Sequence, residues 1–212
     1  MNATDNTTNT TKSKVLIWDL PVRIGHWLMV AGFVTAWLTA ESEELRLVHV
    51  FAGGAMVGIV LFRILWGLIG SRYARFIDFV RSPSAVITYL KSLMGPSPQH
   101  WVGHNPAGGL AIVALLCLVL ASGASGWLNY QDIGSEWMEE LHEGAVNTLL
   151  AVVLVHLTGV FVGSLAHREN LPRAMVTGRK LAHASDAISS ARPVAAIFLL
   201  IWASVVAWLV SR

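Results

Sequence analysis

Residues 141–166, LHEGAVNTLLAVVLVHLTGVFVGSLA, form an apolar stretch that carries two histidines, His142 and His156. Its most apolar part, 145–166, is long enough to cross a bilayer as a helix, which takes ~20 residues. Fourteen residues separate the two histidines, a rise of ~21 Å along a helix axis and a rotation about 40° short of four full turns. Both imidazoles are therefore expected on one side of a membrane helix, at two different depths.

Composition places the whole chain in the same class of protein. Of its 212 residues, 54% are apolar and only 13% are charged, about half the charged fraction of a soluble domain. The sequence predicts an all-α integral membrane bundle with a four-helix core and a fifth, C-terminal span. The five expected spans cover residues 24–40, 45–69, 107–128, 145–166 and 194–210.

The chain divides into three predicted parts. Residues 1–14 are polar and rich in Asn and Thr, which predicts a disordered cytoplasmic tail. Residues 15–180 form the main membrane domain, and residues 181–212 form a linker with the fifth span. In the long loop between the second and third spans, residues 84–94 are expected to form a short amphipathic helix at the membrane surface.

Lys and Arg residues are distributed unevenly between the two sides of the membrane. Twelve lie before the first span and in the loops 70–106 and 167–192, whereas the two loops on the opposite side contain only Arg46. Because positive loops stay in the cytoplasm, we expect a bacterial inner-membrane protein with a cytoplasmic N-terminus and a periplasmic C-terminus. The net charge of +2 is too small to indicate nucleic-acid binding.

Four histidines lie within the expected spans or one turn from them, and their depths form two pairs. His26 and His156 share the cytoplasmic level (the inner pair), and His49 and His142 share the opposite level (the outer pair). Ionisable side chains inside a membrane are costly and indicate function, although each alone could be a hydrogen-bonded packing residue. Two imidazoles without a third ligand suit the axial positions of a haem iron, whereas tetrahedral zinc needs more ligands. The single Cys excludes a covalently attached c-type haem, so the sequence predicts two haems b.

Arg63 follows His49 by fourteen residues and so belongs to the inner level on the same helix face. A buried Arg needs an anion, and a haem propionate would serve. The alternative is that Arg63 snorkels to the lipid headgroups. Gly53, Gly54 and Gly58 remove bulk between the two levels, which leaves room for a porphyrin, for close helix packing, or for both.

Three motifs resemble the prokaryotic cytochrome b561 family, which includes the cytochrome b subunits of nickel–iron hydrogenases, formate dehydrogenases and thiosulfate reductases. WDLPVRIGHW at 18–27 is similar to its first-span signature, while GSRYARF at 70–76 and GHNPAGG at 103–109 match a hydrogenase-type subgroup. The resemblance covers about 15–180. It implies a dihaem four-helix core, with ligands at the four paired histidines, that exchanges electrons between a quinone and a partner outside the membrane.

The resemblance also makes Asn105 a candidate for the quinone site, since the matching cytoplasmic loop helps to bind quinone in the formate dehydrogenase relatives. The match is loose at this point. Asn105 directly precedes Pro106 and the third span, so its other expected role is to cap that helix.

The leading functional hypothesis is an electron-transfer subunit of a respiratory chain, rather than a stand-alone enzyme. It would join a periplasmic c-type cytochrome or a hydrogenase-like enzyme to the quinone pool. An alternative is a quinone oxidoreductase that acts on a small molecule such as superoxide, but the acidic outer loops would repel that anion and attract a Lys-rich cytochrome. A transporter that relays protons through its histidines is a third hypothesis, and it predicts no haem absorbance.

Overall fold

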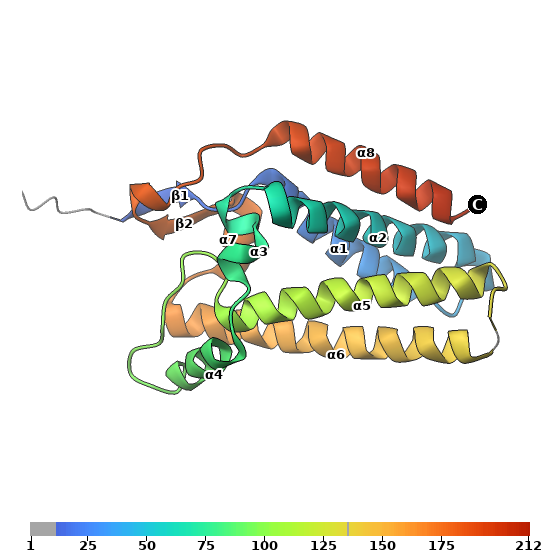
Figure 1. Cartoon of the computed structure of the whole chain (residues 1–212), viewed down its shortest axis with the longest axis horizontal. Helices are drawn as coiled ribbons and strands as arrows, with labels where there is room; N and C mark the ends of the chain where they lie inside the picture. Colours follow the sequence, from blue (N-terminus) through green and yellow to red (C-terminus); the bar gives the residue numbers. More distant parts are fainter. Residues whose placement is uncertain (1–11, 135) are drawn as a thin grey trace, which may run out of the picture.

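Five long helices lie side by side in the computed structural model, which describes residues 12–134 and 136–212 (Figure 1). Four of them coincide with predicted spans to within four residues at each end, and the fifth, α6, starts earlier than predicted. Their bounds are α1 Leu20–Thr39, α2 Arg46–Ile69, α5 Pro106–Tyr130, α6 Glu136–His167 and α8 Pro193–Val210.

Four stretches are long and apolar enough to cross a membrane: Glu43–Ile69, Pro106–Tyr130, Glu136–His167 and Pro193–Val210. Helix α1 is less apolar, because Arg23 and His26 lie in its first two turns, but its 20 residues match the length of a span. Strand β1 (Ser13–Leu16) before α1 pairs antiparallel with strand β2 (Arg179–Ala182) after α6. Both strands lie at one end of the bundle, so the chain between them must cross the membrane an even number of times. Helices α2, α5 and α6 make three crossings, and α1 is therefore the fourth.

The long helices form three layers (Figure 1). Helices α1 and α2 pack together as one pair, and α5 and α6 as another. The two pairs touch each other mainly through α2 and α5, where Met56, Val60, Val119 and Leu149 form a buried core. Helix α8 packs along α2 and α1 on the side away from α5 and α6.

The glycines of α2 serve two different purposes. A Cβ atom on Gly54 would lie 3.1 Å from the Cα of Ala207, and one on Gly58 would lie 3.0 Å from the Cα of Ala203. The Nε1 of Trp202 also donates to the Gly58 carbonyl at 3.0 Å. Of the two roles predicted for these glycines, Gly54 and Gly58 thus serve close helix packing, because they let α8 approach α2. A Cβ on Gly53 would meet nothing within 4 Å, so this position borders open space.

Short elements close one end of the bundle, and we call this assembly the cap. It comprises the two strands together with α3 (Phe76–Phe79), α4 (Pro83–Ser92) and α7 (Leu171–Thr177). Helix α4 matches the short helix predicted at 84–94. The buried centre of the cap includes Ile17, Trp18, Tyr73, Ala74, Ala174 and Ala182.

Two predicted boundaries differ from the structure at the cap. The predicted disordered tail 1–14 lies outside the described residues as far as residue 11, but Ser13 and Lys14 belong to β1 and pair with Ala182 and Leu181. The predicted linker at 181–212 likewise begins inside β2. The sequence analysis missed both strands because each is only four residues long and its partner lies far away in the chain.

Helix α6 begins nine residues before the predicted span. At 32 residues it is ~48 Å long, whereas the hydrocarbon core of a bilayer is ~30 Å thick. The extra turns start at Glu136 and carry exposed acidic side chains at Glu136, Glu139, Glu140 and Glu143. His142 therefore lies on a continuous helix rather than at a frayed helix end.

Candidate functional site

The outer pair meets in the structure. The imidazole rings of His49 and His142 have centroids 6.3 Å apart and planes at 75°. The Nδ1 of His49 lies 2.8 Å from the Ala36 carbonyl of α1, and the Nδ1 of His142 lies 2.8 Å from the Ser122 carbonyl of α5. An Nδ1–H that donates to a carbonyl leaves the Nε2 lone pair free, which is the usual arrangement of a metal-binding histidine.

This geometry fits a metal ion held between the two rings. Imidazoles that bind one ion from opposite sides, with bonds of about 2 Å, have ring centres roughly 6 Å apart. Helix α5 makes room for one ring with a glycine, since a Cβ on Gly126 would lie 2.7 Å from Cε1 of His142. Gly53, one turn after His49, borders open space. The outer pair can therefore hold a haem iron, with space beside it for the macrocycle.

The inner pair also lies on facing helices, at the end of the bundle near the cap. His26 on α1 and His156 on α6 are close enough for their charges to interact. The Nδ1 of His26 is buried and has no hydrogen-bond partner. Gly159, one turn after His156, borders open space as Gly53 does. The inner level thus brings two imidazoles near each other beside an open position at Gly159, but without, among the described residues, the carbonyl partners that orient the outer pair.

Arg63 extends from α2 toward α3. Its guanidinium carbon lies 5.4 Å from the ring centre of Phe76 and 5.5 Å from that of Phe79. The Nη1 atom is buried and unpartnered. A side chain that snorkels to the headgroups would expose its guanidinium, so this geometry favours the alternative in which Arg63 faces an anion.

Asn105 caps α5, as one of its two predicted roles requires. Its Oδ1 accepts a hydrogen bond from the Gly108 N–H at 2.7 Å, and Pro106 occupies the first helical position. Its side chain also contacts the hydroxyl of Tyr89, a buried residue of α4 whose pKa is raised by burial. The quinone role of Asn105 stays a prediction.

The sequence analysis missed Asp19, which is 0% exposed and connects α1, α2 and the loop after α2. Its carboxylate accepts hydrogen bonds from the backbone N–H of Val22 at 2.9 Å, from Nε1 of Trp66 at 2.9 Å and from Oγ of Ser71 at 2.5 Å. An Asp two residues before a Pro at a helix start is an N-cap signal. The two additional donors come from distant segments and leave no such signal.

His104 is a second residue whose position was not predicted from the sequence, where it was noted only as part of the motif GHNPAGG. Its ring lies between Trp18 and Phe79, with centroid distances of 4.4 Å and 4.9 Å. The Nδ1 atom is buried without a partner. Burial lowers the pKa of His104 to about 3, and the positive charges of Arg63 and Lys180 act in the same direction.

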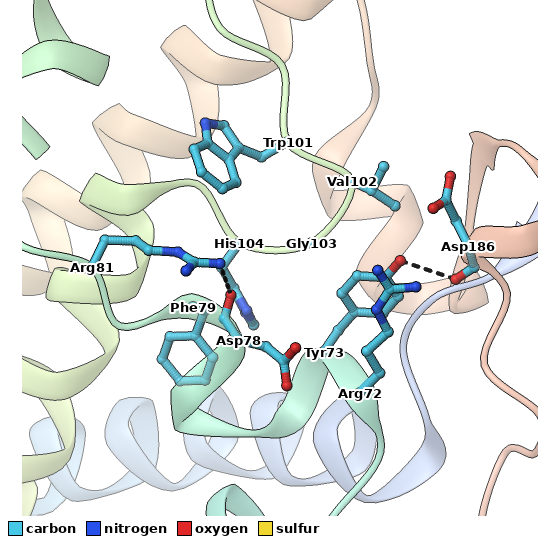
Figure 2. Close-up of a pocket in the computed structure, with 10 residues that line it drawn as sticks. All are labelled: Arg72, Tyr73, Asp78, Phe79, Arg81, Trp101, Val102, Gly103, His104 and Asp186. Carbon is cyan, nitrogen blue, oxygen red and sulfur yellow. Dashed lines mark hydrogen bonds between the residues drawn. The ribbon is translucent and has the colours of Figure 1, made fainter. Parts of the chain in front are cut away.

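A cavity of about 200 Å³ lies beside His104 in the cap. Figure 2 shows its lining and two of the hydrogen bonds that organise it: Arg81 donates to the Asp78 carbonyl at 2.7 Å, and the Tyr73 hydroxyl donates to the Asp186 carbonyl at 3.0 Å. The ring of His104 leaves the loop 101–104 on the side of Phe79 and Tyr73. The cavity therefore belongs to the cap, while His104 forms part of its wall.

A buried ion pair fastens the loop before α5 to the turn after α6. Lys180 is 7% exposed, and its Nζ lies 2.9 Å from Oε2 of Glu169 and 3.0 Å from the Val102 carbonyl. Nε2 of His100 lies 2.7 Å from the other carboxylate oxygen of Glu169. Burial alone would raise the pKa of Glu169, but the hydrogen bonds and charges of Lys180 and His100 outweigh it and lower this pKa below its usual value.

Comparison with known proteins supports one family. The family sequence model described as prokaryotic cytochrome b561 matches residues 17–178. A probable Ni/Fe-hydrogenase B-type cytochrome subunit of Bradyrhizobium diazoefficiens is 23% identical over 78% of this chain and 85% of its own length. The counterpart from Rhizobium leguminosarum is 22% identical over 80% and 90%. A probable Ni/Fe-hydrogenase 1 B-type cytochrome subunit of Escherichia coli K12 is 29% identical over 55% and 60%. No solved structure matches the chain.

Proposed function

Because the chain belongs to the prokaryotic cytochrome b561 family, we propose that it carries electrons between a periplasmic redox partner and the quinone pool. As a member of this family, the protein is a multi-pass membrane cytochrome b that functions in electron transport, and its cofactor is haem b. The observation that carries the proposal is the outer pair, in which two imidazoles on different helix pairs face each other with their Nδ1 atoms held by backbone carbonyls.

The proposed cofactor load is two haems b. His49 and His142 would hold the outer haem iron, and His26 and His156 would hold the inner one. Each haem, when bound, supplies reversible one-electron chemistry. The chain orients the outer imidazoles through the Ala36 and Ser122 carbonyls and supplies Arg63 as a partner for a propionate.

The proposed orientation places the cap in the cytoplasm of a bacterial cell and the His49–His142 level near the periplasm. The basic loops support this orientation, since twelve Lys and Arg residues lie at or near the cap end of the spans. Helix α8 follows the even number of crossings that join β1 and β2 and ends at the opposite end of the bundle (Figure 1). This arrangement gives a periplasmic C-terminus.

The proposed partner is a periplasmic c-type cytochrome or a hydrogenase-like subunit that docks on the first turns of α6. The names of the relatives connect them with Ni/Fe hydrogenases. The exposed acids of α6 lie along one face of the helix, beside two exposed apolar side chains, Trp137 and Leu141. Apolar side chains next to charged ones are typical of a protein-docking surface, and the negative charge favours a basic partner. The same charge disfavours the alternative substrate superoxide.

The proposed quinone site lies at the inner level, near Asn105. Asn105 is next to His104 in the chain, and His104 lies close enough to His26 and His156 for their charges to interact. A quinone bound there would exchange electrons with the inner haem over a short distance.

Spectroscopy of the purified protein tests the proposal. A reduced-minus-oxidised spectrum should show a b-type haem, and haem assay should give two haems per chain that acid acetone extracts. A reduced quinone analogue should reduce the inner haem anaerobically, and a reduced soluble cytochrome or hydrogenase-like partner should reduce the outer haem. A chain that takes up no haem would contradict the proposal and favour the proton-relay transporter.

A further inference from the structure

The bundle end near the cap holds more buried basic groups than the described acidic groups satisfy. Lys180 is paired with Glu169. Asp19 is close enough to Arg63 for their charges to interact, but its two oxygens are already engaged by three donors. Nη1 of Arg63 and Nδ1 of His104 remain buried without a hydrogen-bond partner among residues 12–134 and 136–212. Burying a charge or a polar atom without a partner costs free energy. With the imidazole proton of His104 on Nδ1, both atoms are donors that call for an acceptor entering with a ligand.

The two unpartnered atoms belong to one location. Phe79 touches both side chains, since its ring centre lies 4.9 Å from that of His104 and 5.5 Å from the guanidinium carbon of Arg63. Trp18 holds the other face of the His104 ring at 4.4 Å. These aromatic contacts fix the direction of both donors.

The acceptor must be near the inner pair. The charges of Arg63, His26 and His156 all act on His104, so all four groups share one region between α1, α2, α6 and the loop before α5. A guanidinium beside a neutral imidazole calls for an anion rather than an uncharged carbonyl, because only an anion neutralises the buried positive charge.

We propose that His104 and Arg63 together bind a propionate carboxylate of the inner haem, with His104 as a hydrogen-bond donor. This inference rests on the proposed function, because it requires a haem at the inner pair. It assigns to His104 a positioning role in cofactor binding. A donor to the propionate draws negative charge away from the iron, which favours the reduced haem, so His104 should raise the midpoint potential of the inner haem.

Potentiometric titration and infrared spectroscopy test this assignment in the full-length protein. The variants are His104→Leu, which removes the donor, and His104→Gln, which keeps one. The control is His100→Gln, which changes a histidine of the same loop that pairs with Glu169 instead. All are loaded with haem carrying ¹³C in the propionate carboxylates, and the redox-difference infrared spectrum is recorded together with both midpoint potentials.

We expect His104→Leu to lower the potential of the inner haem and shift the ¹³C carboxylate band, while the outer haem stays unchanged as an internal reference. His104→Gln should recover part of both effects, and His100→Gln should show neither. If His104→Leu loses both haems through misfolding, Arg63→Gln replaces it, because it leaves the Trp18–His104–Phe79 stack intact and should shift the same band.

Two outcomes would overturn the role of His104, and a third would overturn the proposed function. An unchanged inner potential and carboxylate band in His104→Leu would overturn it while leaving the proposed function intact. An altered KM for quinol with no change in potential would place a quinone, not a propionate, at His104. A wild-type protein without haem would instead overturn the proposed function itself.

Discussion

His49 and His142 face each other across the two helix pairs, with ring centroids 6.3 Å apart. His49 belongs to α2 and His142 to α6, and their Nδ1 atoms are held by carbonyls of α1 and α5. All four core helices therefore contribute to one pair of imidazoles. The distance between the rings depends on how the α1–α2 pair packs against the α5–α6 pair.

Replacing single histidines should remove the two proposed haems separately. His142→Leu should reduce the haem content from two to one per chain and abolish the spectral component of the outer haem, and His156→Leu should do the same for the inner haem. The pyridine haemochrome assay measures both. His183→Gln, in the cap and outside both pairs, should keep two haems. Loss of both haems from either Leu variant would contradict independent sites.

Gly126→Ala should disturb the outer haem, because the added Cβ would lie 2.7 Å from Cε1 of His142. We expect this variant to bind the outer haem more weakly, which titration of the apo-protein with haem measures. We also expect a changed midpoint potential of the outer haem, which potentiometry measures. Gly144→Ala is the matched control, since its Cβ would meet nothing within 4 Å. An outer haem that is equally stable in both variants would show that Gly126 does not set the ring position.

The acidic start of α6 should govern association with a basic redox partner. Neutralising Glu136, Glu139 and Glu140 with Gln should slow association at low salt while leaving the haem spectra unchanged. In the wild type the rate should fall as ionic strength rises past ~0.1 M, where the screening length is ~10 Å. Stopped-flow reduction by a cationic c-type cytochrome measures this. A rate indifferent to salt would favour a permanently bound hydrogenase-like subunit.

Asp19→Ala should destabilise the fold strongly. The loss of an N-cap costs ~1 kcal/mol, and each buried donor left unpaired, here on Trp66 and Ser71, costs a further ~1–3 kcal/mol. Thermal unfolding in detergent, followed by circular dichroism, should show a large drop in midpoint. Asp78→Ala removes a more exposed ion pair with Arg75 and should cost less than ~1 kcal/mol. Equal effects of the two variants would refute the assigned role of Asp19.

Glu169 should make stability depend on pH in the acidic range. Its pKa is lowered in the folded chain, so its contribution is complete above its unfolded pKa of ~4.3 and is lost as the pH falls through the folded value. Glu169→Gln should therefore lower the thermal midpoint at pH 7, and the difference from wild type should shrink below about pH 4. Glu43→Gln, at an exposed position, is the control. A difference that does not change with pH would contradict the prediction.

The helices and the histidine levels could be predicted because both depend on local spacing. Apolar runs of sufficient length locate the spans, and the fourteen-residue intervals fix which side chains share a face. The predicted start of α6 is nine residues too late, because hydropathy detects only the part of a helix that lies in lipid. Glu136 and the following turn are helical but polar, and this signal is absent from an apolar window.

The contacts of Asp19 and His104 could not be predicted, since they arise from segments that meet only after folding. Asp19 reaches Trp66 and Ser71, about fifty residues away in the chain. The unfilled hydrogen-bond capacity of His104 is likewise a property of its surroundings. A single sequence shows the residue type at such positions but not its partners.

The pairing of β1 with β2 imposes an order on biosynthesis. Residues 13–16 are made before their hydrogen-bond partners at 179–182, and four membrane crossings separate the two strands. Until residues 179–182 have emerged from the ribosome, β1 lacks its partner strand, so the cap can close over this end of the bundle only after the four crossings have been made.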